Sequence, residues 1–273
     1  MNATAPQTNA HSAYVSAAPE NPNTMGSLGL TFLTVENAGF YALLDKAFPG
    51  VSSNPKCTGL LAHLAILANH GPLTGVGYCA TWEYPQSSPN TKQVHVTAIH
   101  QRHPNDQRSQ PLRHGSIRLL APGLNIEESE YAVDGITEVE RLASTATSTS
   151  PPTRVFLDTL ILENGFVVGP LSSNFIHVYN GVRNAEHDAG FSLFWNLRHT
   201  QDPQQLQAKL QQHIDRGIAS TQENPKSFYR RAMGVEAAAM LAIIQQKGLA
   251  ALVSDAKSRV RYGRERTKQH LRA

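Results

Sequence analysis

The stretch that decides the fold is RVFLDTLILENGFVVGP, from Arg154 to Pro170. It predicts a strand, a tight turn at Asn164-Gly165 and a short return strand that ends at Gly169-Pro170. Asn-Gly favours positive φ at both central positions of a turn, so it is the strongest short-range signal for a β-hairpin. The sequence before this hairpin has the patterns of strands, and the sequence after it has the patterns of helices.

The first strand of this hairpin is apolar on both faces, because Val155, Leu157 and Ile161 alternate with Phe156, Leu160 and Leu162. Such a strand lies inside a structure, and one way to cover both faces is a sandwich core on one and C-terminal helices on the other. We therefore predict a mainly β plus α protein, in which an immunoglobulin-like antiparallel β-sandwich is followed by a helical C-terminal region. The cysteine–tryptophan–cysteine pattern of antibody domains is missing.

Further strands are predicted from runs rich in apolar residues and from alternation, at 28–35, 60–68, 76–84, 94–99 and 116–120. The acidic segment 126–142 fits a strand or a helix, and the sequence does not decide between them. Residues 143–153, ASTATSTSPPT, form a low-complexity spacer ahead of the hairpin.

The C-terminal region has helix start and stop signals. Ser172 or Ser173 can cap a first helix, Asp202-Pro203 begins a second and Asn224-Pro225 begins a third, which ends at Gly248 before a last helix. An apolar stripe recurs at every fourth residue of the second helix, at Leu206, Leu210, Ile214 and Ile218. The predicted organisation is a flexible lead at 1–26, the sandwich at 27–170, the helical region at 171–264 and a basic tail at 265–273.

The charge of the chain is uneven. Residues 256–273 hold seven Lys and Arg and one Glu, a net charge of +6, so the other residues carry −3 of the total of +3. A basic tail can bind an anionic surface or nucleic acid, but the interpretation we prefer is a solvated helix end, so nucleic acid is not the expected partner. No apolar run approaches the roughly 18 residues of a membrane span, and none is expected.

The start of the chain has no basic segment followed by an apolar one, so no signal peptide is expected. This points to the cytoplasm, or to a location outside it if a signal has been removed. The cysteines, Cys57 and Cys79, are interpreted as two reduced thiols, with one disulfide as the alternative.

Two segments carry a resemblance to a known group. The run of Val155, Leu157, Asp158, Asn164, Gly165, Phe166, Val167, Gly169 and Pro170 resembles a segment of uncharacterised bacterial β-sandwich proteins, and LLAHLAILANHGPLTGVGYCATWEYP (60–85) is similar to their strand–turn–strand unit. The resemblance covers about half of the chain. It implies the sandwich followed by a helical tail, but it implies no activity and no site residues. Leu171 stands where an acidic residue is commoner in that group, which argues against a metal-binding loop there.

Several polar groups suggest possible chemistry. His95, His100, His103 and His114 lie close in sequence with Asp106, but their spacing matches no zinc site, so we interpret them as a solvated loop. Glu186-His187-Asp188 are helix neighbours that point in different directions, which suits a polar face better than an acid–base group. Motifs such as GxSxG, HExxH and the Walker A loop are absent from the sequence.

Three residues are retained as candidate binding residues: Trp82, Tyr84 and Asp158. The aromatic pair shares one strand face with Tyr78 and could form a ligand platform, although core packing is the commoner role. Asp158 lies in an apolar strand, where a carboxylate must be paired or hydrogen-bonded, by loop backbone or by an arginine such as Arg154 or Arg183.

From these patterns we expect a non-catalytic binding or structural module, with an unknown protein or small ligand as partner, no cofactor, and no catalytic or metal-ligating residue assigned. The alternatives are a metal-dependent hydrolase that uses the histidine-rich loop, and association with an anionic surface or nucleic acid through the basic tail. The sequence does not indicate an oligomeric state.

Overall fold

The computed structural model describes residues 23–85, 92–100, 111–131, 135–146, 150–199, 202–222 and 224–270. The predicted lead therefore lies outside the described residues up to residue 22, and so do His103 and Asp106 of the histidine-rich loop. At the C-terminal end the backbone is described as far as His270 and the side chains as far as Lys257, so the side chains of the predicted basic tail also lie outside the described part.

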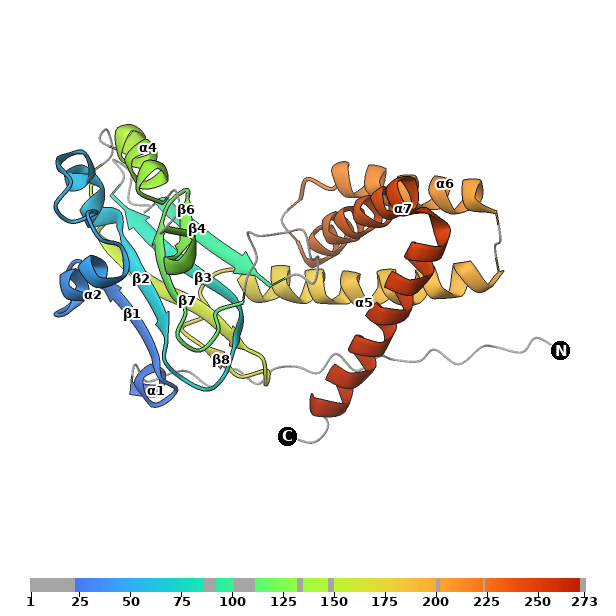
Figure 1. Cartoon of the computed structure of the whole chain (residues 1–273), viewed down its shortest axis with the longest axis horizontal. Coiled ribbons are helices and arrows are strands. Elements are labelled where there is room, and N and C mark those ends of the chain that lie inside the picture. The colour runs from blue at the N-terminus through green and yellow to red at the C-terminus, as the bar shows by residue number, and fades with distance from the viewer. Residues whose placement is uncertain are drawn as a thin grey trace.

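Within these residues, two antiparallel four-stranded sheets form one half of the molecule, and three long helices form the other (Figure 1). Sheet A has the order β1-β2-β5-β6, and sheet B has the order β4-β3-β7-β8. The strands are β1 (Leu30–Thr34), β2 (Ala65–Asn69), β3 (Gly75–Tyr84), β4 (Lys92–Ile99), β5 (Ile117–Ala121), β6 (Leu124–Glu127), β7 (Arg154–Leu162) and β8 (Val167–Val168). The helices are α1 (Asn23–Ser27), α2 (Phe40–Ala47), the 3₁₀ helix η1 (Pro55–His63), α3 (Glu128–Glu130), α4 (Ile136–Ala146), α5 (Phe175–His199), α6 (Pro203–Ile218) and α7 (Pro225–His270).

The predicted hairpin is confirmed as β7 and β8. Leu160 pairs with Val168 and Ile161 pairs with Val167. The turn differs from the prediction: Gly165 has a positive φ of 88° but Asn164 does not, and the Leu162 amide donates to the Phe166 carbonyl across the three-residue loop 163–165. The neighbouring segment 60–68 is only partly a strand, because Leu60 to His63 belong to η1 and the strand begins at Ala65. The undecided acidic segment 126–142 contains the end of β6 followed by helices α3 and α4.

The two sheets pack face to face as a β-sandwich. Their shared core contains Leu67 and Leu120 from sheet A and Trp82, Leu157 and Leu160 from sheet B. Alternation explains the arrangement, since Leu67 points into this core while its neighbours Ile66 and Ala68 point to the opposite face of sheet A.

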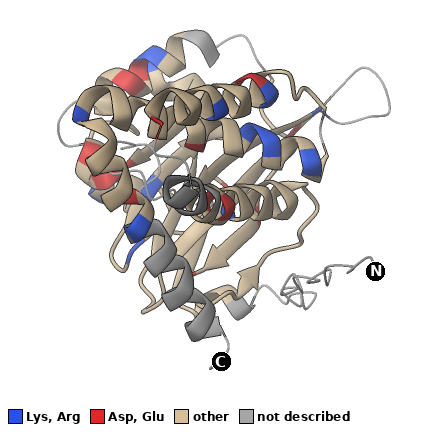
Figure 2. Cartoon of the chain, turned by 90° about the vertical axis from the view of Figure 1, so that its right-hand side faces the viewer, with Lys and Arg blue, Asp and Glu red and all other residues tan. Residues whose placement is uncertain are grey.

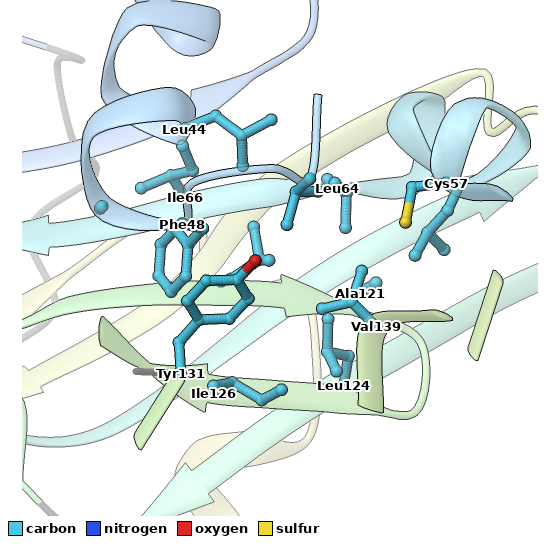
Figure 3. Close-up of a cluster of buried hydrophobic side chains, with 14 of the residues drawn as sticks. Leu44, Phe48, Cys57, Leu64, Ile66, Ala121, Leu124, Ile126, Tyr131 and Val139 are labelled. Carbon is cyan, nitrogen blue, oxygen red and sulfur yellow. The ribbon is translucent and has the colours of Figure 1, made fainter. Parts of the chain in front are cut away.

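The outer face of sheet A is covered by α2, η1 and α4. Figure 3 shows this second core, in which Phe48 and Tyr131 lie edge to face, with ring centroids 5.3 Å apart, over Ile66 and its neighbours. Cys57 of η1 is buried in the same cluster. The outer face of sheet B is covered in part by the first turns of α5, where Phe175 and Tyr179 pack on Val76 and Cys79. The order of layers is therefore helices, sheet A, sheet B and α5.

The helical region is a bundle of α5, α6 and α7, and its start signals are confirmed. Asp202 accepts a hydrogen bond from the Gln204 amide with Pro203 at the first helical position, and Asn224 caps α7 through the Ser227 amide. Gly217 and Gly234 allow α6 and α7 to touch, because a Cβ on Gly217 would lie 3.1 Å from the Gly234 Cα. Gly248, at φ 80° and ψ 175°, interrupts α7 as predicted, and the following half buries Leu252 and Ala256 in the bundle core.

Candidate functional site

A β-bulge places Asp158 at the junction between the sandwich and the helical region. In the pairing of β3 with β7, Cys79 faces Thr159 and the next residue, Ala80, faces Leu157, so Asp158 is an extra residue without an opposite partner in the ladder. Its side chain is fully buried. The bulge turns this side chain toward the loop that leads into α5, rather than into the apolar core.

The Asp158 carboxylate accepts hydrogen bonds from both residues of the loop Ser172-Ser173. Its Oδ1 lies 2.8 Å from the Ser172 amide nitrogen and 3.2 Å from that of Ser173, and both serine hydroxyls also donate to the carboxylate. The Thr159 hydroxyl adds a bond of 2.8 Å to Oδ2. Because α5 begins two residues after Ser173, the carboxylate lies at the positive end of the helix dipole.

The backbone around this loop is shaped to reach Asp158. Gly169 has a φ of 114°, and a Cβ there would lie 2.3 Å from the Asp158 carbonyl oxygen, so only glycine fits this close approach. The same carbonyl accepts a hydrogen bond from the Leu171 amide at 3.1 Å, with Leu171 itself at a φ of 57°. We call this arrangement of Asp158, Gly169, Leu171, Ser172 and Ser173 the junction latch.

The protonation of Asp158 follows from these contacts. Burial alone raises the pKa of the carboxyl, but the hydrogen bonds from Ser172, Ser173 and Thr159 outweigh burial and hold its pKa below the ordinary value. The sequence suggests loop backbone or an arginine as the partner of the Asp158 carboxylate, and in the structure the loop Ser172-Ser173 supplies the hydrogen bonds. The carboxylate is therefore charged at neutral pH and engaged in holding the start of α5.

A thiol and an imidazole lie beside the latch. The Ser173 hydroxyl lies 3.6 Å from Cys79 Sγ, and His95 Nδ1 lies 3.9 Å from the same sulfur and 2.9 Å from the Thr81 hydroxyl. The sequence did not reveal this group, although Cys79 and Thr81 alternate with core residues of β3 and so share its outer face. The bulge that brings Asp158 to the same place has no signal in the sequence.

This group lacks the electrostatics of a nucleophilic cysteine. Burial raises the pKa of Cys79 to about 11; the Ser173 hydrogen bond opposes this shift, and the nearby Asp158 charge adds to it. Reactive cysteines are partly exposed and have a lowered pKa, because the thiolate is the nucleophile. Cys79 is 1% exposed. The arrangement therefore suits a structural junction better than covalent catalysis.

We expect both cysteines to resist thiol reagents in the folded protein at pH 8. The pKa of Cys57 is also raised, first by burial and then by the Glu140 charge, so neither thiol offers an accessible thiolate. The measurement is the rate of reaction with Ellman's reagent, with protein in denaturant as the control for full reactivity. Rapid modification of Cys79 but not of Cys57 in native protein would contradict this expectation and return attention to a Cys79–His95 pair.

The histidines of the proposed metal site occupy different parts of the fold where they are described. His95 is opposite Thr81 in the β3–β4 pair, whereas His114 donates from Nδ1 to the Gly71 carbonyl at 3.1 Å, near the Gly75 end of β3. Gly75 and Thr81 are separated along the strand by about 20 Å. Within the described residues, no group of three His, Cys, Asp or Glu side chains is placed to hold a metal ion.

Trp82 and Tyr84 lie on the inner face of sheet B. Trp82 is fully buried and its Nε1 donates to the His63 carbonyl at 2.8 Å, so the indole offers no exposed ring to a ligand. Tyr84 is half-buried at the end of β3, where its hydroxyl lies 3.0 Å from His63 Nδ1 and the two rings stack. Burial lowers the pKa of His63, which favours the neutral ring in this contact.

The Glu186-His187-Asp188 run makes separate contacts on α5. Glu186 pairs with Arg183 at 2.7 Å, while Asp188 accepts a hydrogen bond of 2.9 Å from the Tyr229 hydroxyl of α7. These two carboxylates point to different neighbours, as expected for adjacent helical positions. Arg183 also donates to the His100 carbonyl at 2.6 Å, which ties α5 to the end of β4.

A second candidate surface lies on the helical region. Ile218, the last member of the predicted stripe of α6, is 76% exposed, and Val235 of α7 is 53% exposed. The segment Pro225–Lys257 is long and apolar enough, by length and composition alone, to cross a membrane, yet only 22% of its most apolar 18-residue window is buried. The sequence does not reveal this surface, because no uninterrupted apolar run marks it.

Comparison with known proteins gives no relative for this chain: no family model, no curated protein and no solved structure matches it. The features that bear on function are the junction latch and the exposed surface around Ile218 of α6 and Val235 of α7, which we call the helical surface.

Proposed function

We propose that this protein is a non-catalytic binding module, in which the β-sandwich is the scaffold and the helical region carries the binding surface. The observation that carries the proposal is the exposure of two large aliphatic side chains next to the contact between α6 and α7, Ile218 and Val235. Val235 is 53% exposed and Ile218 of α6 is 76% exposed, whereas Leu241, Ile243 and Leu249 of α7 pack against the core of the bundle. A contiguous apolar surface exposed on a folded protein is typical of an interaction site.

The junction latch supports this division of roles. Asp158 fixes the start of α5 to sheet B, and Phe175 and Tyr179 pack on the sheet directly after it. The helical surface is thus held by a buried anchor and not by a loose linker. A binding surface that is held rigidly before its partner docks loses less conformational entropy on binding.

The proposal includes an immunoglobulin-like relation for the sandwich. Two features support it: sheet B, with the order β4-β3-β7-β8, can be aligned with the C′-C-F-G order of immunoglobulin domains, and β3 carries a buried tryptophan as strand C does. Sheet A departs from that plan, because β5 pairs directly with β2 and β6 lies at the edge. The related prediction, a kinship with uncharacterised bacterial β-sandwich proteins, also remains a proposal.

Site-specific photocrosslinking in living cells tests the binding role. A photoreactive amino acid at Val235 should form adducts on irradiation, because a partner covers this position in the cell. The matched control is the same amino acid at Phe166, which is apolar and 61% exposed but lies on the β7–β8 turn. Adducts at 235 and none at 166 are the expected result. The absence of adducts at 235, or equal adducts at both positions, would refute the proposed function.

A further inference from the structure

We propose that β4 is a docking edge for a second copy of this chain, and that two copies join their B sheets into one continuous sheet. In the described part of the chain, β4 ends the order of sheet B and pairs with β3 alone, in a ladder that has no bulge. It has eight residues, whereas the strands at the other sheet borders, β1, β6 and β8, have five, four and two. β4 is therefore the longest open edge of the described sandwich.

The hydrogen bonds between β3 and β4 show which backbone groups of β4 point away from the sheet. The His100 amide donates at 2.9 Å to the Val76 carbonyl, which continues the register that pairs Ile99 with Gly77. Because bonded and non-bonded pairs alternate in an antiparallel ladder, the even-numbered residues of β4 bond to β3 and the odd-numbered residues point outward. The outward N–H and C=O groups, which have no strand partner in the described chain, belong to Gln93, His95, Thr97 and Ile99.

β4 lacks the features that usually keep an exposed edge from pairing. Such edges are protected by a short strand, Pro, a bulge or several charged side chains. The sequence of β4, KQVHVTAI, contains no Pro and one charged residue, Lys92, at its first position. In Figure 2 most of the blue and red segments lie on helices, and the strands are largely tan. On the inner face of β4, Val94 and Ala98 are only half-buried, so a further strand would find both open backbone groups and apolar side chains to cover.

The side chains of β4 are complementary to a second, antiparallel copy of the same strand. A twofold axis at Val96 places outward residues opposite outward residues, with Thr97 of one copy opposite His95 of the other, as the hydrogen bonds require. On the inner face, Val96 then lies opposite its own equivalent and Val94 lies opposite Ala98. These apolar cross-strand pairs extend the sandwich core from one copy into the next.

Charge and closure favour a second copy over other occupants. The Lys92 side chains of the two copies lie at opposite ends of the paired strands, about 27 Å apart, so no like charges face each other. A twofold contact uses the same edge of both molecules and closes at two copies. Pairing of β4 with β1, β6 or β8 of another copy would engage at most the five residues of β1 and would leave further edges open.

Sedimentation equilibrium of the full chain over a range of concentrations tests the proposal. We expect a monomer–dimer equilibrium that Thr97→Pro weakens by about tenfold or more, because the symmetry removes an outward N–H from both copies. The ladder with β3 does not use this N–H, so the sandwich should still fold, as a native circular dichroism spectrum would show. Thr97→Val is the matched control, because it keeps the amide and should leave the dimer unchanged.

Cysteine crosslinking tests the register without removing an amide. Val96→Cys should form a disulfide between two copies under oxidising conditions, because the Cα atoms of a non-bonded pair are about 4.5 Å apart, within disulfide range. Val94→Cys is the matched control. Its Cα would lie about 14 Å from its own equivalent, so it should not form the link. The native Cys57 and Cys79 are buried, so the wild-type protein should not form it either.

Three results would overturn the inference: a monomer at every concentration, a dimer that Thr97→Pro leaves unchanged, and a disulfide formed by Val94→Cys but not by Val96→Cys. A dimer that Val235→Glu abolishes and Thr97→Pro preserves would place the contact on the helical surface instead. The inference does not rest on the proposed function, because photocrosslinks from position 235 and dimerisation through β4 are separate observations. Either can fail while the other stands.

Discussion

Asp158→Ala is expected to lower the free energy of unfolding by about 1.5–3 kcal/mol, the range for hydrogen bonds to a charged group. The substitution removes the acceptor for the two amides of the loop Ser172-Ser173 and for the neighbouring hydroxyls. The Thr159 hydroxyl is buried and loses its acceptor, whereas Ser172 is exposed and Ser173 half-buried, so water replaces part of their bonds to the carboxylate. The measurement is urea unfolding followed by circular dichroism.

The pH dependence of the free energy of unfolding provides an independent check on the contribution of the Asp158 carboxylate. Its pKa is lowered in the folded protein, so its contribution is fully present above the ordinary aspartate pKa of about 3.9 and is lost as the pH falls through the lowered value. The difference in unfolding free energy between wild type and Asp158→Ala should therefore shrink below about pH 4. The matched control is Glu163→Ala, an exposed carboxylate that accepts one bond of 3.2 Å from the Thr74 amide and should cost about 1 kcal/mol or less. Equal losses of unfolding free energy from Asp158→Ala and Glu163→Ala would contradict the stabilising role of Asp158 in the junction latch.

Trp82→Ala is expected to lower the free energy of unfolding by about 3–5 kcal/mol, as large-to-small replacements of buried aromatic residues do. The indole is fully buried between the sheets, so its removal leaves a cavity that both sheets border. It also leaves the His63 carbonyl without the 2.8 Å bond from Nε1.

Tyr84→Phe is the matched control for Trp82. It lies two residues along the same strand face and loses only the hydroxyl that lies 3.0 Å from His63, so the expected cost is about 0.5–1.5 kcal/mol. Unfolding free energies from urea titrations of the two variants decide the comparison. A Trp82→Ala loss no larger than that of Tyr84→Phe would show that the indole is not part of the packed core.

Local signals predicted much of the fold because they depend on neighbours in the chain. Gly165 determined the hairpin turn through its positive φ, Asp202-Pro203 the start of α6 and Gly248 the break in α7, each through a backbone preference of the residue itself. Period-2 alternation located β3 correctly. The segment 60–68 failed at its beginning because its apolar residues suit a buried 3₁₀ turn as well as a strand.

The candidate sites were harder to predict because they depend on register and on distant contacts. Asp158 stands out in the sequence as a carboxylate in an apolar strand, but its burial against Ser172 and Ser173 follows from a one-residue bulge that no sequence pattern marks. Ile218 belongs to a regular apolar stripe, and the pattern grouped it with the buried Leu206 and Leu210. Each step of four residues drifts by about 40° around a helix, so Ile218 lies about 120° from Leu206 and has turned out of the core.

The latch also determines how the molecule can be divided. A fragment cut after Pro170 would keep Asp158 but lose Ser172 and Ser173, so a buried carboxylate would face water-filled space in place of its donors. It would also lose Tyr179, which packs against Gly77 closely enough that a Cβ there would lie 3.0 Å from its ring. The sheets and the bundle are therefore separable in the sequence but not as independent folding units, and the first turns of α5 belong physically to the sandwich.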